Sequence, residues 1–153
     1  LPGKSCKHNL TYWYNQPYLG VGPGAHSYLG NHRLGNLNSP REYMKRVKRW
    51  SEHEHSFEEL VTINNAGTLG MVETIDLRLE MAETMLLGLR LCEGVSENAF
   101  KKRFGMEIRE VYTTQIPDLE ALGLIDSLSA NYLRLTPKGR LLGNEVFQRF
   151  LEH

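Results

Sequence analysis

The sequence predicts an α+β protein whose second half is mostly helical and carries one β-hairpin. Apolar residues recur at steps of three and four from Ile75 to Leu89, which is the period of an amphipathic helix. Two short apolar runs flank Ser129–Asn131, a stretch typical of a hairpin turn. Thr136 and Pro137 then supply an N-cap and a first helical residue for a final helix.

The N-terminal part is rich in Gly, Pro, Asn and Tyr. Its clearest element is Tyr18–Gly22, a short apolar run that we expect to form a strand leading into a tight turn at Pro23-Gly24. Ser39 and Glu42 have the spacing of a capping box, and Pro40 occupies the first helical position, so a helix is expected to begin there.

That helix is expected to be amphipathic, with Tyr43, Val47 and Trp50 on one face. Basic residues between positions 41 and 49 crowd the rest of its surface. Acidic residues follow soon after Trp50 and balance them, so this face is interpreted as solvated rather than as a binding surface.

The middle of the chain predicts a series of helices. A short one is expected at Ser56–Val61, ahead of a loop at 64–67, and another begins at the N-cap Ser96 and stops at Gly105. Cys92 lies at an apolar helix end and is expected in the core.

A further helix begins near Ile108, and Pro117 either kinks it or opens a new helix that runs to Gly123. The hairpin and the terminal helix follow. One apolar face of the terminal helix is expected to pack into the core through Leu142, Val146 and Phe150.

This order of elements is winged-helix-like, which raises the question of DNA binding. The element in the recognition-helix position, 107–122, carries four acidic residues against the single base Arg109. Such a surface repels phosphate, although Arg134, Lys138 and Arg140 follow it. The chain as a whole has 18 basic and 18 acidic residues and a net charge of zero. We therefore expect no nucleic-acid partner, and DNA binding is the least favoured function.

Two cysteines, Cys6 and Cys92, are too few for a disulfide framework or a cysteine metal site, which indicates reduced thiols and a cytoplasmic location. No apolar run reaches the length of a membrane span. The chain lacks an initial Met, and residues 151–153 read like the remnant of a histidine tag, so we expect an excised fragment.

His8 is the first candidate functional residue, because it stands beside Asn9 and is followed by Tyr12 and Trp13. Imidazole is the commonest axial donor to haem iron, the two rings could stack on a porphyrin, and Asn9 could orient the imidazole. The alternative is a hydrogen-bonded packing residue, which spacing alone favours.

A second candidate is the glycine loop Gly20–Ser27, which places an imidazole and a hydroxyl after three glycines. Such a loop could bring a cofactor against main-chain amides. A tight turn without any ligand is the alternative, and spacing alone favours it.

Several motifs of the chain resemble one known family. His8–Trp13 fits the pattern HNxxYW, and Gly20–Tyr28 fits GxGxGAHSY. Further matches follow in the family's order: Ser39–Tyr43, Leu86–Leu91, Leu133–Gly139 and Asn144–Phe147. The sequence resembles the C-terminal part of the HemW-like haem chaperones of the radical-SAM family, which are often labelled oxygen-independent coproporphyrinogen III oxidases.

The resemblance implies a fold and a domain organisation. Residues 1–70 would be the C-terminal remnant of a partial (β/α) barrel, including the glycine loop, and 71–150 a mostly helical, winged-helix-like domain with one hairpin. The longer protein would hold a [4Fe-4S] cluster on a CxxxCxxC motif together with S-adenosylmethionine. This chain has no CxxxCxxC, so it is expected to be catalytically inert by itself.

The resemblance also implies roles for particular residues. HNxxYW is the haem-binding motif of the family, which makes His8 the implied iron ligand, with His26 as the alternative. The surroundings of the haem would be Asn9, Tyr12 and Trp13. The residues expected to lie near S-adenosylmethionine are Gly22, Gly24, Ala25 and Ser27.

Two functions follow from the resemblance. The longer protein is expected to be a haem chaperone that carries haem to haem-requiring respiratory proteins. The alternative is an oxidase that decarboxylates the propionates of coproporphyrinogen III. HNxxYW favours the chaperone, and peripheral membrane association of the longer protein stays open.

Overall fold

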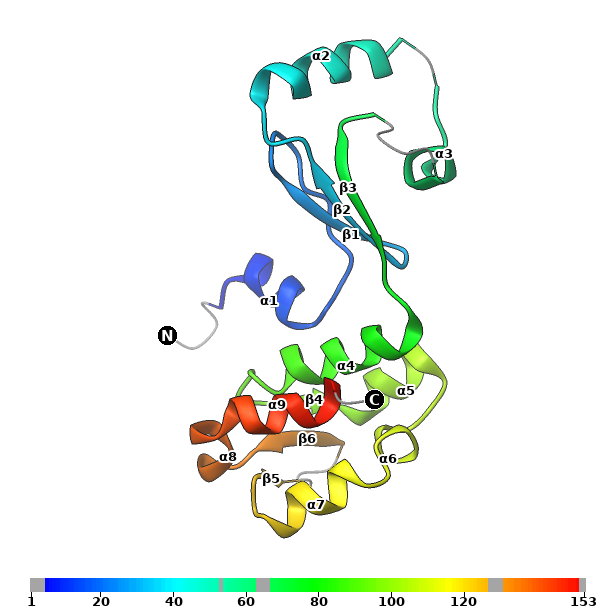
Figure 1. Ribbon diagram of the computed structural model, residues 1–153. Helices are drawn as coiled ribbons and strands as arrows, with labels where there is room; N and C mark the ends of the chain where they lie inside the picture. Colours follow the sequence, from blue (N-terminus) through cyan, green and yellow to red (C-terminus); the bar gives the residue numbers. More distant parts are fainter. Residues whose placement is uncertain (1–4, 53, 63–66, 127–130, 152–153) are drawn as a thin grey trace. The chain divides into compact units, whose positions relative to one another are not determined.

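The computed structural model describes residues 5–52, 54–62, 67–126 and 131–151 (Figure 1). The chain forms two compact units, and each is described by itself. One comprises Gln16–Asp76, and the other combines Leu1–Asn15 with Leu77–His153. Mixed helices and small antiparallel sheets confirm the α+β class. The assignment of residues 1–70 to a barrel and of 71–150 to a separate domain stays a prediction.

The Gln16–Asp76 unit is built on a three-stranded antiparallel sheet that the sequence analysis did not foresee. Its strands are β1 (His26–Leu29), β2 (His32–Asn36) and β3 (Leu69–Thr74), in the order β1-β2-β3. Gly30 turns the chain between β1 and β2 with a φ of 59°. These strands contain many polar residues and no clear apolar alternation, so periodicity gave no signal for them.

The predicted strand Tyr18–Gly22 is wrong. Only Tyr18 pairs, through an isolated antiparallel bridge with Tyr28. The chain then turns, because Gly22 adopts a φ of 107° and Gly24 a φ of 68°. Gly20 passes so close to β1 that a Cβ there would lie 2.1 Å from the His26 carbonyl oxygen. The predicted tight turn is thus confirmed, but the run before it is not a strand.

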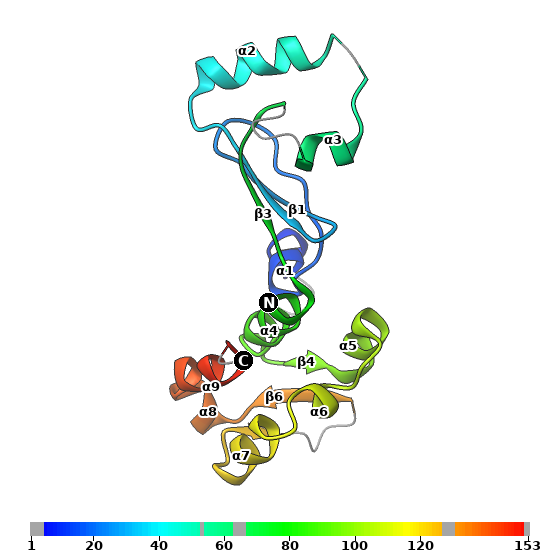
Figure 2. The same ribbon diagram turned by 45° about the vertical axis from the view of Figure 1, so that its right-hand side comes forward.

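Both predicted helices of this unit are present: α2 (Pro40–Trp50) and α3 (Phe57–Thr62). The Ser39 hydroxyl accepts a hydrogen bond from the Glu42 amide, as its capping position predicts. Figures 1 and 2 show α2 beyond the end of the sheet rather than across its face, and no residue of α2 is buried. The expected loop at 64–67 falls largely outside the described residues.

The second unit contains the remaining elements. They are α1 (Lys7–Trp13), α4 (Leu77–Gly88), β4 (Val95–Ser96), α5 (Glu97–Phe104), α6 (Ile108–Val111), α7 (Gln115–Ala121), β5 (Ile125–Asp126), β6 (Tyr132–Leu135), α8 (Pro137–Leu141) and α9 (Gly143–Leu151). The predicted hairpin is confirmed as β5–β6, with Ile125 opposite Leu135. Of its expected turn Ser129–Asn131, only Asn131 is among the described residues.

A short strand, β4, extends this hairpin to an antiparallel sheet of order β4-β6-β5. Figures 1 and 2 both show the sheet lying between α4 and α7. Gly94 makes the close approach of β4 possible, because a Cβ there would lie 2.1 Å from the Leu133 carbonyl oxygen. Two residues are too few for a periodic signal, which is why β4 was not predicted.

The core of this unit joins α4, α5, α7, β6 and α9. Among its most deeply buried side chains are Met85, Phe100, Ile116, Leu133, Val146 and Phe150. α4 packs against α9, as the apolar faces of the two helices predict. Tyr112 meets Phe150 edge to face, with ring centroids 4.9 Å apart.

Two predicted helices are interrupted. Pro117 is the third residue of the separate helix α7, where the missing amide hydrogen of proline is not needed, so the new-helix alternative is correct. The single terminal helix is wrong, because Leu142 leaves helical geometry with φ −107° and ψ 26° and separates α8 from α9. α8 packs closely against the backbone of Leu124, since a Cβ on Gly139 would lie 1.9 Å from the Leu124 carbonyl oxygen.

Candidate functional site

The four residues of the HNxxYW motif all lie on α1 and are accessible to solvent. His8 and Asn9 are exposed, and Tyr12 and Trp13 retain 38% and 37% of their accessible surface. No residue of α1 is buried. The motif therefore forms an exposed aromatic surface, and the roles of His8 as iron ligand or as hydrogen-bonded packing residue both stay open.

His8 and Tyr12 stand one helical turn apart and interact directly. The Nε2 atom of His8 lies 3.2 Å from the Tyr12 hydroxyl, and the rings meet edge to face with centroids 5.1 Å apart. Which of the two groups donates depends on the tautomer of the imidazole. The contact holds the imidazole on the same helix face as the tyrosine ring.

Polar contacts fix the end of α1 to the rest of its own unit, Leu1–Asn15 with Leu77–His153, which is called the helical unit below. The Tyr14 hydroxyl donates to a carboxylate oxygen of Glu93. This hydrogen bond, together with burial and the nearby carboxylate charge, raises the pKa of Tyr14 to about 12. Asn15 donates from Nδ2 to the Thr84 hydroxyl at 3.2 Å, and its carbonyl oxygen accepts from Arg103 at 2.7 Å.

Arg103 also forms an ion pair with Glu80 at 2.5 Å, between side chains that are each about one fifth exposed. Both its Nε and Nη2 atoms donate to the same carboxylate oxygen. Because this pair is shielded from water more than a surface pair, removal of one partner is expected to cost more than at an exposed ion pair, since the other charge would lose its partner. It therefore supports the backbone position from which α1 presents the motif.

The backbone amides of the glycine loop donate hydrogen bonds to other groups of the same unit. The amide of Gly20 donates to the Ser27 hydroxyl at 2.9 Å, and that of Gly22 to the Tyr43 hydroxyl at 3.2 Å. The Gly24 and Ala25 amides donate to the carbonyl oxygens of residues 37 and 22. The side-chain amide of Asn36 also donates hydrogen bonds to the Gly20 and Gly22 carbonyl oxygens. The loop is thus held by the protein itself, and these four amides already have acceptors.

His26, the alternative iron ligand, begins β1 and is exposed. It lies opposite Gly35 in the register of the sheet. Ser27, the next residue, is buried and engaged with Gly20. His8 and His26 belong to different compact units.

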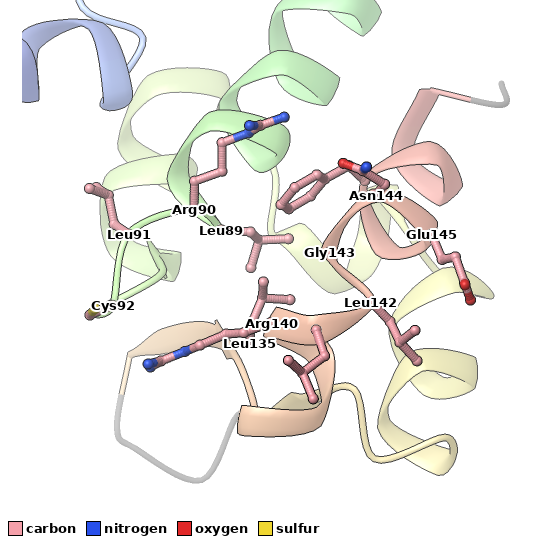
Figure 3. Close-up of a pocket in the computed structure, with 12 residues that line it drawn as sticks. Leu89, Arg90, Leu91, Cys92, Leu135, Arg140, Leu142, Gly143, Asn144 and Glu145 are labelled. Carbon is pink, nitrogen blue, oxygen red and sulfur yellow. The ribbon is translucent and has the colours of Figure 1, made fainter.

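A pocket that the sequence analysis missed lies in the helical unit (Figure 3). Its volume is about 540 Å³. It is lined by Leu89, Arg90, Leu91, Cys92, Leu135, Arg140, Leu141, Leu142, Gly143, Asn144, Glu145 and Phe147. These residues come from the turn after α4, from β6 and from α8 and α9 around their junction, so no local pattern could have identified them.

Cys92 lines this pocket and is exposed, so the prediction that it belongs to the core is wrong. α4 ends at Gly88, and Cys92 falls in the turn before β4 rather than on the helix. Apolar neighbours in sequence did not reveal where that helix stops.

Within the described residues, no group of three or more His, Cys, Asp or Glu side chains could hold a metal ion. A haem iron needs a single protein ligand on one side, so this finding does not bear on His8. The same part of the chain contains no helix with the length and apolar character of a membrane span.

The comparisons with known proteins agree with the motifs. Residues 75–142 match the family described as HemN C-terminal domain. The heme chaperone HemW of Bacillus subtilis (strain 168) is 36% identical over 150 residues, which cover 97% of this chain and 35% of that protein. The heme chaperone HemW of Lactococcus lactis subsp. lactis is 33% identical over 154 residues, covering 99% and 35%.

A solved structure, described as the coproporphyrinogen III oxidase (HemN) of Escherichia coli, a radical SAM enzyme, has a similar fold. The TM-score is 0.57 at 17% identity, over 88% of this chain and 28% of that one. The chain spans about a third of the length of the curated relatives it matches. These likenesses confirm the resemblance read from the motifs: the chain is similar to HemW proteins along nearly its whole length, and its residues 75–142 match the HemN C-terminal domain family.

Proposed function

We propose that this protein binds haem at the exposed face of α1, with His8 as the iron ligand. The observation that carries the proposal is the placement of an accessible imidazole beside accessible aromatic rings on one anchored helix. The names of its relatives support it, because several of them are called heme chaperones.

The residues present fit haem in their chemistry. The imidazole of His8 supplies the nitrogen donor, and Tyr12 and Trp13 supply partly exposed rings against which a porphyrin face can pack. Asn9 is exposed beside His8 and can orient it by a hydrogen bond. The Nε2 atom of His8 contacts the Tyr12 hydroxyl, so iron would bind either at Nδ1 with this contact kept, or at Nε2 once the contact opens.

The role of the longer protein follows from this binding. We propose that it carries haem to haem-requiring respiratory proteins in the cytoplasm, and that it holds a [4Fe-4S] cluster and S-adenosylmethionine outside this chain. Gly22, Gly24, Ala25 and Ser27 would lie near S-adenosylmethionine as a rigid wall, since their amides or hydroxyl already have partners within the Gln16–Asp76 unit.

The two other functions have weaker support. The likeness to the E. coli oxidase concerns the fold alone, so it does not favour oxidase activity for this chain. A winged-helix-like reading of the β4-β6-β5 sheet and its helices remains a proposal. This surface does not favour DNA in that reading, because Lys101 and Arg109 already pair with Glu107 and Glu120, and Glu110 and Asp118 add negative charge.

The test is a haem titration of the chain and of the full-length protein, followed by the Soret band. His8→Ala should abolish the shift of that band, because only stacking contacts remain. His26→Ala is the matched control and should leave the shift intact. Wild-type affinity and spectrum in the His8→Ala protein would refute the proposal, and loss of the shift in His26→Ala alone would move the ligand to the other unit.

A further inference from the structure

The pocket at the α8–α9 junction joins an apolar floor to positive charge. Leu89 is 1% exposed and Leu135 6% exposed, and Figure 3 shows their side chains facing each other across the pocket. Phe147 closes another side and is 7% exposed. Leu141 also lines the pocket and is 87% exposed.

Two arginines line the same pocket. The guanidinium carbon of Arg90 lies 4.6 Å from the centroid of the Phe147 ring, so the ring holds this cation without neutralising it. Within the part of the chain that the structure describes, neither Arg90 nor Arg140 forms an ion pair. Their charge is therefore available to an anion.

One acid, Glu145, also lines the pocket. Figure 3 shows it on the opposite side from the Arg140 guanidinium. This separation gives the pocket a polarity, with a basic side and an acidic side. An anionic group is favoured beside Arg140 and disfavoured beside Glu145.

We propose that this pocket is a second ligand site, which binds an amphipathic carboxylate. The apolar body of the ligand would rest on Leu89, Leu135 and Phe147, and its carboxylate would accept hydrogen bonds from Arg90 or Arg140. The volume of about 540 Å³ falls within the range of roughly 300–1,000 Å³ that is typical of small-molecule sites.

Two kinds of molecule share this chemistry: a tetrapyrrole with carboxylate side chains and a fatty acid. The tetrapyrrole would connect the pocket with the proposed haem function, whereas the site itself uses neither His8 nor iron. Metal-free protoporphyrin IX and dodecanoate therefore serve as the two probes, since neither requires an iron ligand.

The experiment measures the affinity of each probe for the full 153-residue chain by calorimetry. At least one of Arg90→Gln and Arg140→Gln should weaken binding roughly tenfold, because it removes charge-assisted hydrogen bonds to the carboxylate. Arg149→Gln, an exposed arginine of α9 outside the lining, is the matched control and should bind as the wild type does. His8→Ala should also bind these probes normally.

The two cysteines provide a second readout that does not depend on folding of a variant. Both thiols are exposed, but only Cys92 lines the pocket. A bound probe should slow alkylation of Cys92 by a maleimide and leave that of Cys6 unchanged, as followed by mass spectrometry.

Binding of both probes supports a general site for amphipathic carboxylates, and binding of protoporphyrin alone supports a tetrapyrrole site. Three results would overturn the proposal: neither probe binds below millimolar concentration, the arginine variants bind like Arg149→Gln, or His8→Ala abolishes binding of the probes. Equal protection of Cys6 and Cys92 would place the probe elsewhere and overturn it as well.

Discussion

The two compact units differ in how much apolar surface they bury. The unit that contains Leu77–His153 has a continuous core that extends over helices and both edges of its small sheet. In the Gln16–Asp76 unit, the buried apolar side chains of the described residues are Tyr28, Leu34, Leu69 and Ile75, and neither α2 nor α3 buries a residue. Hydrophobic burial is the dominant favourable term in folding, so the unit that contains Leu77–His153 should contribute most of the free energy of unfolding.

The smaller unit is held instead by local and backbone contacts. Ser56 and Glu59 cap α3 reciprocally, at 2.8 and 3.1 Å. Trp50 stacks on His55 with ring centroids 3.5 Å apart, which joins the end of α2 to the start of α3. Such contacts specify a shape but contribute little energy each. The comparison indicates that the unit with Leu77–His153 is the more stable one and that the Gln16–Asp76 unit opens more easily.

The largest effect is expected from the core of the stable unit. Phe100→Ala should lower the free energy of unfolding by about 3–5 kcal/mol, because it leaves a cavity beside Phe104 and the other core residues. Denaturant unfolding measures the change. Phe57→Ala in the other unit is the control, since Phe57 is 44% exposed and should cost far less. Equal losses would contradict the comparison.

The next effect tests whether the smaller unit opens by itself. Gly20→Ala should destabilise it by about 1–3 kcal/mol, because the added Cβ would meet the His26 carbonyl oxygen at 2.1 Å and force the loop away from β1. Amide hydrogen exchange should accelerate in residues 26–36 and stay unchanged in α4 and α9. Faster exchange throughout the chain would show that the two units unfold together.

A third prediction concerns the support of α1. Arg103→Gln should lower stability by about 1–2 kcal/mol, since it removes a partly shielded ion pair with Glu80 and the donor to the Asn15 carbonyl oxygen. Arg109→Gln breaks the more exposed pair with Glu120 and should cost about 0.2–1 kcal/mol. Thermal unfolding compares the two variants, and the reverse order would refute the role given to Arg103.

The smallest effect is a dependence on alkaline pH. Burial raises the pKa of Tyr112 in the folded protein to about 12, from 10.0 when exposed. Below pH 10 both states keep the proton, so this group leaves stability constant. Between about pH 10 and 12 only the unfolded state loses it, and stability should fall by at most about 1.4 kcal/mol per pH unit for this group. Tyr112→Phe should reduce that slope, and an unchanged slope would exclude Tyr112 as its source.

The sequence by itself determined the elements whose causes are local. Ser39, Ser96 and Thr136 each cap the helix that they were expected to begin, because a cap requires only residues a few positions apart. The HNxxYW motif was identified by its resemblance to a family pattern, whereas the helix α1 that carries it was not predicted, and its chemical role stays a proposal.

The tertiary structure decided everything that depends on distant residues. β2 pairs with the distant β3, with Asn36 opposite Leu69, and the predicted strand at Tyr18–Gly22 gave way to a turn because Gly20 must pass beside His26. The pocket is lined by both Arg90 and Arg140, which lie far apart in the sequence. Cys92 is exposed because α4 ends before it. Periodicity and capping report neighbours within a few residues along the chain, whereas strand pairing and pockets arise from contacts between residues that only folding brings together.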